Sequence, residues 1–422
     1  MKKGIVAAVN DYFKVSVKSL GYFVKWLVLA TIVGLITGVV GSAFAHGLTY
    51  VTQLRTANPQ LILAMPVGGL LIVWLYQVSK RGHDKGTNMV LAAVREQDTI
   101  PVRVTPLIFV GTLITHLVGG SAGREGAALQ MGGSIGNGLA KVFKLDRKSV
   151  NSMIMCGMSG AFAALFGTPM AAAIFSMEVV SVGLMYYAAL IPCVVSSLVA
   201  LGVAKAFGVH GESFTILNMP EFALVPAIKI LILAAMCAAV SAIFCKILHF
   251  VSDFAKTKIK NPYIRVVAGS ILIILLSWIL GTTDYLGAGM PIIEHAMEGH
   301  VRPEAFILKM IFTAITLAVG FRGGEIVPTL FVGATFGCFA GGLLGISPSL
   351  CAAVGMASVF CGVTNTPIST LLIALELFGM DAFPYMMLGI ATSYMLSGYS
   401  GLYHSQKIVY SKFKPEMNKG DT

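Results

Sequence analysis

The residues best suited to chemistry lie in one glycine-rich segment, 119–133, whose sequence is GGSAGREGAALQMGG. Arg124 and Glu125 are adjacent there, with a glycine on either side of the pair. A second glutamate, Glu325, follows a pair of glycines in a similar segment. A carboxylate at the start of a helix can bind the free amide groups of the first turn, and it can also exchange a proton. These residues therefore predict anion binding, proton transfer or both.

The same segment also reads G-x-S-x-G, a pattern that places Ser121 between glycines. A nucleophilic serine needs a positioned base and an oxyanion hole. His116 lies five residues upstream, but the segment lacks the strand-turn-helix context of a nucleophile elbow. An intramembrane serine hydrolase that uses Ser121 is therefore kept only as a remote alternative, and no catalytic residue is predicted.

The composition indicates which kind of secondary structure must position these residues. Of the 422 residues, 56% are hydrophobic and only 12% are charged, whereas a soluble domain has about 25% charged residues. The chain is therefore predicted to be an all-α integral membrane protein. A spanning helix needs about 20 apolar residues, and the apolar runs leave room for ten or more membrane segments. Glycine and proline interrupt several runs, which favours tilted and half-spanning helices buried within the protein.

The net charge of +11 does not indicate nucleic-acid binding, because the basic residues lie in short loops between apolar runs and near the termini. This pattern follows the positive-inside bias and predicts a multi-pass protein of the cell's inner membrane with both termini in the cytoplasm. No cleavable signal peptide is evident. The seven cysteines lie within apolar runs and contain no C-x-x-C pair, so we expect small buried side chains and predict no metal site and no cofactor.

The chain contains an internal repeat. Residues 157–178 match residues 355–376 at an offset of 198 residues (355 − 157), including two Thr-Pro pairs and Glu178 with Glu376. An upstream echo at an offset of 200 residues (325 − 125) pairs Glu125 with Glu325 and Gly133 with Gly333. The polar stretch 208–222 joins the halves, and two homologous membrane halves indicate a transporter or channel. The predicted divisions are an interfacial N-terminal helix (1–20), two half-repeats (21–210 and 211–406) and a short cytoplasmic tail (407–422).

Each half has the same local order. An apolar helix ends at glycine, a glutamate follows, and a helix rich in small residues begins. The first turn of that helix has free amide groups and a partial positive charge, which together can bind a dehydrated anion. Such a site needs no lysine or arginine in the pore, where a full charge would hold an anion too tightly for release.

Four elements, in this order, resemble the CLC family of chloride channels and transporters. Gly86-Thr87-Asn88 stands at the position of the family's GSGIP motif, and Gly123-Arg124-Glu125-Gly126 resembles GREGP. The segment from Gly323 to Pro328 is similar to G-x-F-x-P, and Tyr403 falls where the family places its pore tyrosine. The resemblance covers essentially the whole membrane chain, and its motif wording is closest to the fluoride/proton antiporter branch.

The resemblance implies a homodimer in the lipid bilayer, with two inverted halves and one anion pathway in each subunit. It implies that Glu125 is the gating and proton-exchanging residue, whose carboxylate occupies the pathway and swings out when protonated. It implies hydroxyl contacts to the anion from Thr87 and Tyr403, and amide contacts near the two glutamates. The implied anion-binding residues are Thr87, Asn88, Arg124, Gly126, Glu325, Ile326, Val327 and Tyr403. The side chain of Arg124 is also interpreted as a structural partner of a carboxylate or of carbonyl groups.

One departure from the family bears on proton transfer. The chloride/proton exchangers have a second glutamate on the inner side, and the aligned position here is Val179. The fluoride branch also lacks that glutamate, so the resemblance implies proton-coupled fluoride export. A chloride transporter or passive chloride channel on the same fold remains the alternative. Glu178 and Glu376 are interpreted as structural residues rather than as proton carriers.

Overall fold

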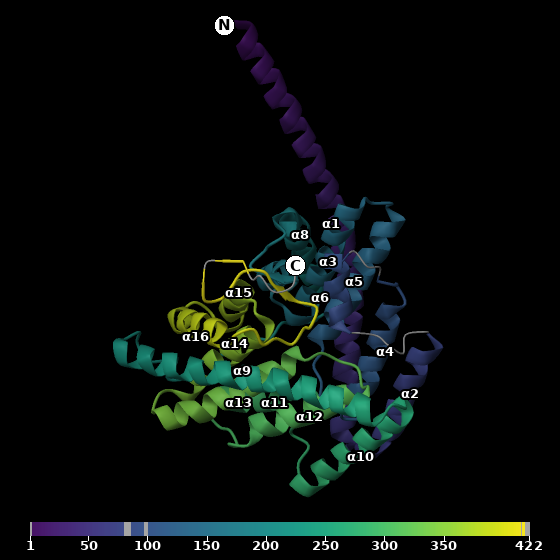
Figure 1. Ribbon diagram of the computed structural model, residues 1–422, viewed down its shortest axis with the longest axis vertical. Coiled ribbons are helices and arrows are strands. Elements are labelled where there is room, and N and C mark those ends of the chain that lie inside the picture. Colours follow the sequence, from purple (N-terminus) through teal and green to yellow (C-terminus); the bar gives the residue numbers. More distant parts are fainter. Residues whose placement is uncertain (1, 80–85, 97–99, 415, 418–422) are drawn as a thin grey trace.

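The computed structural model describes residues 2–79, 86–96, 100–414 and 416–417, and within them it forms 16 α-helices and two very short strands (Figure 1). The first eight helices are α1 (Lys2–Ala57), α2 (Met65–Val78), α3 (Thr87–Glu96), α4 (Val104–Leu117), α5 (Glu125–Val142), α6 (Arg147–Phe166), α7 (Pro169–Glu178) and α8 (Leu190–Ala206). The second eight are α9 (Leu224–Lys258), α10 (Pro262–Leu280), α11 (Met290–Met297), α12 (Ala305–Val319), α13 (Ile326–Leu344), α14 (Pro348–Thr364), α15 (Pro367–Phe378) and α16 (Phe383–Leu396).

Helix lengths confirm the expected mixture of full and partial spans. Among the described residues, 7 helical segments are long and apolar enough to cross a membrane. Shorter apolar helices accompany them, including α4, α12, α14 and α15. The predicted N-terminal helix is not a separate element, because α1 runs without a break from Lys2 to Ala57. Residues 418–422 of the predicted tail lie outside the described residues.

The two halves match helix by helix, each of the first eight with the helix eight places later. The main packing pairs recur in the same pattern: α5 packs on α6 as α13 packs on α14, and α1 packs on α8 as α9 packs on α16. The halves meet at an isolated antiparallel bridge between Gly123 and Gly324. Each glycine donates its N–H to the other's carbonyl, at 2.6 and 2.8 Å. Equivalent residues therefore face each other across a local two-fold axis, which is how inverted halves meet.

This bridge corrects the register predicted for the upstream part of the repeat. Gly123 pairs with Gly324, so Arg124 is equivalent to Glu325, and Glu125 is equivalent to Ile326. The predicted pairing of Glu125 with Glu325 was wrong by one residue. Helix starts agree with the corrected register, since Glu125 is the first residue of α5 whereas Glu325 immediately precedes α13. The predicted pairing matched two glutamates by identity, although they occupy different positions relative to their helix starts.

Glycines allow the central helices of each half to cross at backbone contact. A Cβ atom on Gly132 would lie 2.1 Å from the carbonyl oxygen of Gly157, and a Cβ on Gly333 would lie 2.5 Å from that of Gly355. Both distances exclude a side chain at these crossings. The second half thus repeats the crossing of the first, with Gly132 rather than the predicted Gly133 equivalent to Gly333.

Glu178 and Glu376 each bind the start of a helix in the opposite half. Glu178, the last residue of α7, accepts the backbone N–H groups of Ile368 and Ser369 at the start of α15, at 3.1 and 2.8 Å. Glu376, in the last turn of α15, accepts those of Met170 and Ala171 at the start of α7, both at 3.0 Å. Each carboxylate therefore satisfies the free amides of a helix in the other half. This contact accounts for both residues by a structural role.

The joining segment between α8 and α9 is held at two points. A Cβ atom on Gly167, which ends α6 with φ of 80°, would lie 2.3 Å from Cα of Gly211. Further along, the N–H of Phe214 donates to the carbonyl of Leu377 at 3.0 Å. The segment is therefore packed against both halves.

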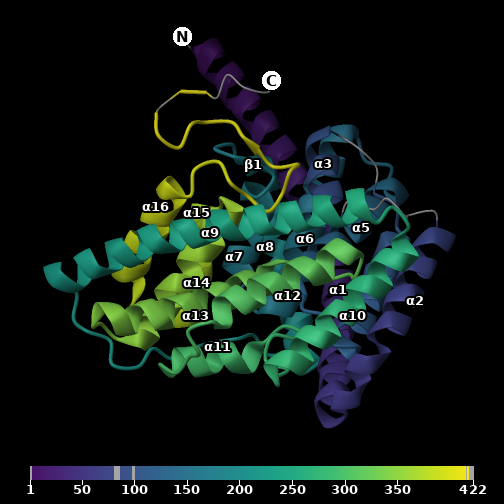
Figure 2. The ribbon, with the colours of Figure 1, turned by 60° about the horizontal axis from the view of Figure 1, so that its bottom comes forward.

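The C-terminal segment folds back onto the first half, on the side of the molecule from which the first turns of α1 project (Figure 2). Its strand β2 (Lys407–Ile408) pairs in parallel with β1 (Ser181–Val182). The Nε2 group of Gln406 donates to the carbonyl of Val179 at 3.0 Å. Val179 itself is fully buried, so the position of the missing inner glutamate is covered by this segment.

Candidate functional site

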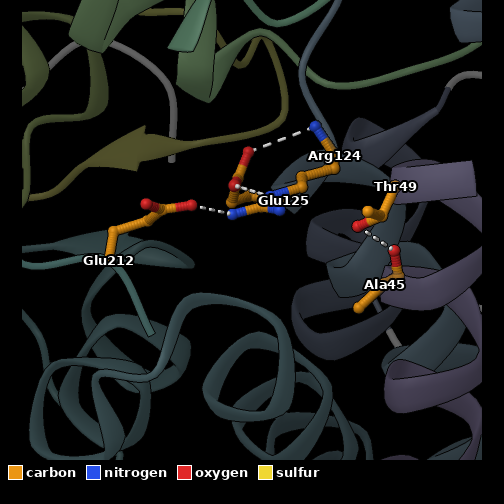
Figure 3. Close-up of polar contacts among 5 residues, drawn as sticks. All are labelled: Ala45, Thr49, Arg124, Glu125 and Glu212. Atoms are coloured by element: carbon orange, nitrogen blue, oxygen red, sulfur yellow. Dashed lines mark hydrogen bonds and ion pairs between the residues drawn. The ribbon is translucent and has the colours of Figure 1, made fainter. Parts of the chain in front are cut away.

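Glu125 begins α5 beside the bridge between the halves, and its side chain is fully buried. Its Oε2 atom accepts the backbone N–H of Arg124 at 3.2 Å, and its Oε1 atom accepts Nε of Arg124, also at 3.2 Å (Figure 3). The carboxylate therefore folds back over the start of its own helix. It occupies the place where free amides and the partial positive charge would otherwise attract an anion.

Arg124 joins this carboxylate to a second one. Its Nη2 group lies 2.9 Å from Oε1 of Glu212, which belongs to the joining segment (Figure 3). Glu212 was not predicted from the sequence, because nothing in its local pattern indicates a partner 88 residues away. The two ion pairs agree with the structural interpretation of Arg124, and its contact with the anion stays a prediction.

Gly126 brings Thr87 and Glu325 together on the other side of the bridge. A Cβ atom on Gly126 would lie 2.8 Å from Cα of Gly324, 3.3 Å from Oγ1 of Thr87 and 3.5 Å from Oε2 of Glu325. Glu325 is half-buried, and its Oε2 atom has no hydrogen-bond partner among the described residues. A residue without a side chain is therefore required here, and it leaves room for a hydroxyl and a carboxylate next to the start of α5.

Gln130 is a further residue of this cluster that the sequence analysis missed. Its Nε2 group donates to the carbonyl of Gly126 at 3.2 Å and lies 3.5 Å from Oγ1 of Thr87. A polar residue one turn into a helix of small residues was the available signal. Gln130 is buried, and its Oε1 atom has no partner in the described part of the chain.

Asn88, Ile326 and Val327 are placed differently from these residues. The Oδ1 atom of Asn88 accepts the N–H of Ser405 at 2.9 Å, so this side chain holds the loop that follows α16. Ile326 and Val327 are buried in the first turn of α13, where only their amides could face the centre. A Cβ atom on Gly123 would lie 3.0 Å from the amide nitrogen of Val327.

Tyr403 lies in the loop that Asn88 holds, and it is 4% exposed. The preceding residue, Leu402, donates its N–H to the carbonyl of Val363 at 2.9 Å. No described residue hydrogen-bonds the Tyr403 hydroxyl, which is buried. This hydroxyl is therefore a donor still available inside the protein.

Two cavities approach this centre, and they are equivalent under the repeat. The distal cavity, about 350 Å³, is lined by the last turns of α1 together with His116, Arg124 and Ala288. The terminal cavity, about 290 Å³, is lined by the last turns of α9 together with Leu317, Glu325 and Thr87. Glu125 lines neither of them. The chain thus forms two related cavities, and the buried carboxylate of Glu125 is exposed to neither.

The hydroxyl of Ser121 has a partner that explains it without catalysis. Its Oγ atom lies 3.0 Å from Oγ1 of Thr313, and its N–H donates to Oγ1 of Thr316 at 3.1 Å. The equivalent bond in the other half joins the N–H of Arg322 to Thr115, also at 3.1 Å. Ser121 therefore belongs to a pair of contacts that tie each helix break to the opposite half. No group of three or more potential metal ligands occurs among the described residues.

The chain is similar to known proteins in its family pattern, its sequence and its structure. The model of the family described as voltage gated chloride channel matches residues 68–398. A chloride/fluoride channel protein of Pseudomonas syringae pv. tomato is 35% identical over 93% of this chain and 88% of its own length. An H(+)/Cl(-) exchange transporter of Vibrio parahaemolyticus is 26% identical over 83% of this chain and 81% of its own.

Solved structures agree with these matches. The crystal structure of a CLC-type fluoride/proton antiporter superposes with a TM-score of 0.88 at 30% identity, covering 91% of this chain and 98% of the other. A slow cyanobacterial Cl-/H+ antiporter has the same fold, with a TM-score of 0.76 at 20% identity over 88% of this chain and 94% of the other. With its two inverted halves and the family model matched across most of its length, the chain belongs to the voltage gated chloride channel family, the CLC family.

Proposed function

We propose that this protein exports fluoride in exchange for protons, with Glu125 as the gate. The observation that carries the proposal is the sealed position of the Glu125 carboxylate, which accepts the N–H of Arg124 at the N-terminal end of α5 and lines neither of the two cavities. A carboxylate that binds helix amides competes directly with an incoming anion for the same donors. Protonation cancels its charge and weakens its hold, so proton uptake and anion entry become linked.

Fluoride is small and strongly hydrated, so a site that binds it must offer several donors close together. The hydroxyl of Thr87 and the amide group of Gln130 both donate to the carbonyl of Gly126, and we infer that they turn to the anion when it enters. The unpartnered hydroxyl of Tyr403 is a third available donor. Similarity to a CLC-type fluoride/proton antiporter and to a chloride/fluoride channel protein supports the same choice of anion.

The proposal also includes orientation and assembly. The terminal cavity faces the cytoplasm and the distal cavity faces outward. This orientation follows from the positive-inside bias of the basic loops and of both termini. The protein acts in the inner membrane as a homodimer, with one pathway per subunit. Cross-linking of the purified protein in membranes measures the subunit number, and a monomer as the only species would contradict the dimer.

Chloride transport on the same fold is the second candidate. It is favoured by the similarity to an H(+)/Cl(-) exchange transporter. It predicts a different selectivity without any change in the role of the fold.

The test is a paired flux measurement in proteoliposomes. Fluoride and chloride efflux are recorded from identical vesicles, together with proton uptake. We expect fluoride efflux that is faster than chloride efflux and that drives protons inward. Chloride efflux as fast as fluoride efflux would favour the second candidate, and halide efflux without proton movement would contradict the exchange mechanism.

A further inference from the structure

Arg124 is shared between two carboxylates that come from different parts of the chain. Its Nε group contacts Glu125 at 3.2 Å, and its Nη2 group contacts Glu212 at 2.9 Å (Figure 3). Glu125 belongs to α5, whereas Glu212 belongs to the segment that joins the two halves. One positive charge therefore balances two negative charges, so each carboxylate weakens the hold of Arg124 on the other.

The position of Glu212 is set by the fold. The residue before it, Gly211, packs backbone to backbone against Gly167 at the end of α6. Two residues later, the N–H of Phe214 is bound by the carbonyl of Leu377 at 3.0 Å. Because the chain is anchored on both sides of Glu212, its carboxylate is directed at Arg124 by the packing of the joining segment.

The two carboxylates differ in their access to water. The side chain of Glu125 is 0% exposed, whereas that of Glu212 is 30% exposed and that of Arg124 is 19% exposed. Glu212 is therefore in contact with solvent, whereas Glu125 is sealed from it. Among the described residues, the other charged or titratable groups around this cluster are His116 on α4, Arg55 on α1, Asp284 before α11, Lys309 on α12, Glu325 before α13, and Tyr403 in the loop after α16.

We propose that Glu212 is a positioning residue that sets the external proton concentration at which Glu125 is released from the start of α5. The inference rests on the proposed function, since it assumes that Glu125 is the gate. With Glu212 ionised, Arg124 is divided between two partners, and a second negative charge favours protonation of Glu125. Without that charge, Arg124 belongs to Glu125 alone, and more acid is needed to open the gate.

The test is the dependence of proton-coupled fluoride flux on external pH in the Glu212→Gln variant. Glutamine keeps an oxygen for Arg124 but removes the charge, so the contact persists while the electrostatic effect is lost. We expect the profile to move toward acid by about one pH unit. Glu212→Asp retains the charge and should keep the profile closer to that of the wild type. Glu221→Gln is the matched control, because this exposed glutamate of the same segment has its charge removed without contact to Arg124.

A double variant distinguishes this role from a purely structural one. In a Glu125→Gln background, we expect Glu212→Gln to cause no further change in the pH dependence of fluoride flux. An unchanged profile in the single Glu212→Gln variant would overturn the inference, as would an equal shift in the Glu125→Gln background. If the wild type moves halide without protons, the proposed function fails and this inference fails with it, and that outcome is visible before any variant is made.

Discussion

The distal and terminal cavities are built from equivalent segments, yet they carry different side chains. Gly86 and Gly287 occupy equivalent positions, with φ of 60° and 59°, and each precedes a short helix at its own mouth. At the helix starts, however, Arg124 lines the distal cavity where Glu325 lines the terminal one. The features that both halves share are those that hold the fold, and the features that differ are those that can give the two ends different functions.

A second difference concerns how carboxylates bind helix amides. Glu178 and Glu376 each bind two amides of a helix in the opposite half, and the repeat preserves both contacts. Glu125 binds the start of its own helix, and the repeat places Ile326 at the equivalent position. The same chemistry therefore serves as a permanent cap in two places and, in our proposal, as a releasable one in the third.

The largest effect is expected where the shared scaffold is disturbed. In Gly132→Ala, the new methyl group would lie 2.1 Å from the carbonyl oxygen of Gly157. The crossing of α5 and α6 cannot open without moving the helix starts, so we expect no folded protein in detergent by size-exclusion chromatography. Gly202→Ala is the control, because no atom lies within 4 Å of its Cβ position. It should fold normally, and equal behaviour of the two variants would contradict the close crossing.

Removal of a permanent cap should cost less. In Glu178→Gln or Glu376→Gln, the charge that binds two amides is lost while one oxygen remains. We expect the free energy of unfolding to fall by about 2 kcal/mol, as for a hydrogen bond to a charged group. Denaturant titration in micelles measures this change, and a Glu298→Gln variant at an exposed position is the control. Flux should remain coupled to protons, and loss of coupling would mean that these residues do more than cap helices.

One substitution would make the lining of the terminal cavity more like that of the distal cavity. Thr87→Ala gives the terminal cavity the side chain that Ala288 supplies at the equivalent place in the distal one. We expect fluoride flux to fall about tenfold, because one hydrogen bond to the anion is lost. Thr105→Ala is the matched control, since its hydroxyl binds the carbonyl of Met131 and its side chain lines neither cavity. Equal flux in the two variants would remove Thr87 from the site.

The smallest effect is expected at Ser121, whose equivalent position in the other half is occupied by Arg322. Ser121→Ala removes the contact with Thr313 and should lower the free energy of unfolding by about 1 kcal/mol. Ser134→Ala, which removes a buried hydroxyl bond to the carbonyl of Pro101, should cost a similar amount. Fluoride flux should be unchanged in both variants. A hydrolytic activity that disappears only in Ser121→Ala would contradict the structural role.

Several of these features could be predicted from the sequence because they depend on local pattern. Apolar runs gave the membrane helices, and glycines beside Glu125 gave the helix break. The repeat predicted the matching roles of Glu178 and Glu376, although not that each would cap the other's half. That exchange depends on how the halves dock, which spacing alone does not specify.

The errors and omissions also have physical causes. Aligning Glu125 with Glu325 favoured residue identity over helix phase, and only the backbone contact between Gly123 and Gly324 set the register. The contact between Arg124 and Glu212 joins residues far apart in the chain and depends on the packing of Gly211. Such contacts are set by tertiary structure rather than by local preference.

The central claim is that Glu125 is the releasable carboxylate, and the most direct measurement is proton uptake during fluoride efflux from proteoliposomes that contain Glu125→Gln. This variant keeps the shape of the side chain and removes its charge and its ability to exchange a proton. We predict that fluoride still moves while proton uptake disappears, whereas Glu178→Gln retains both. Proton uptake that continues in Glu125→Gln at the wild-type ratio to fluoride would contradict the account.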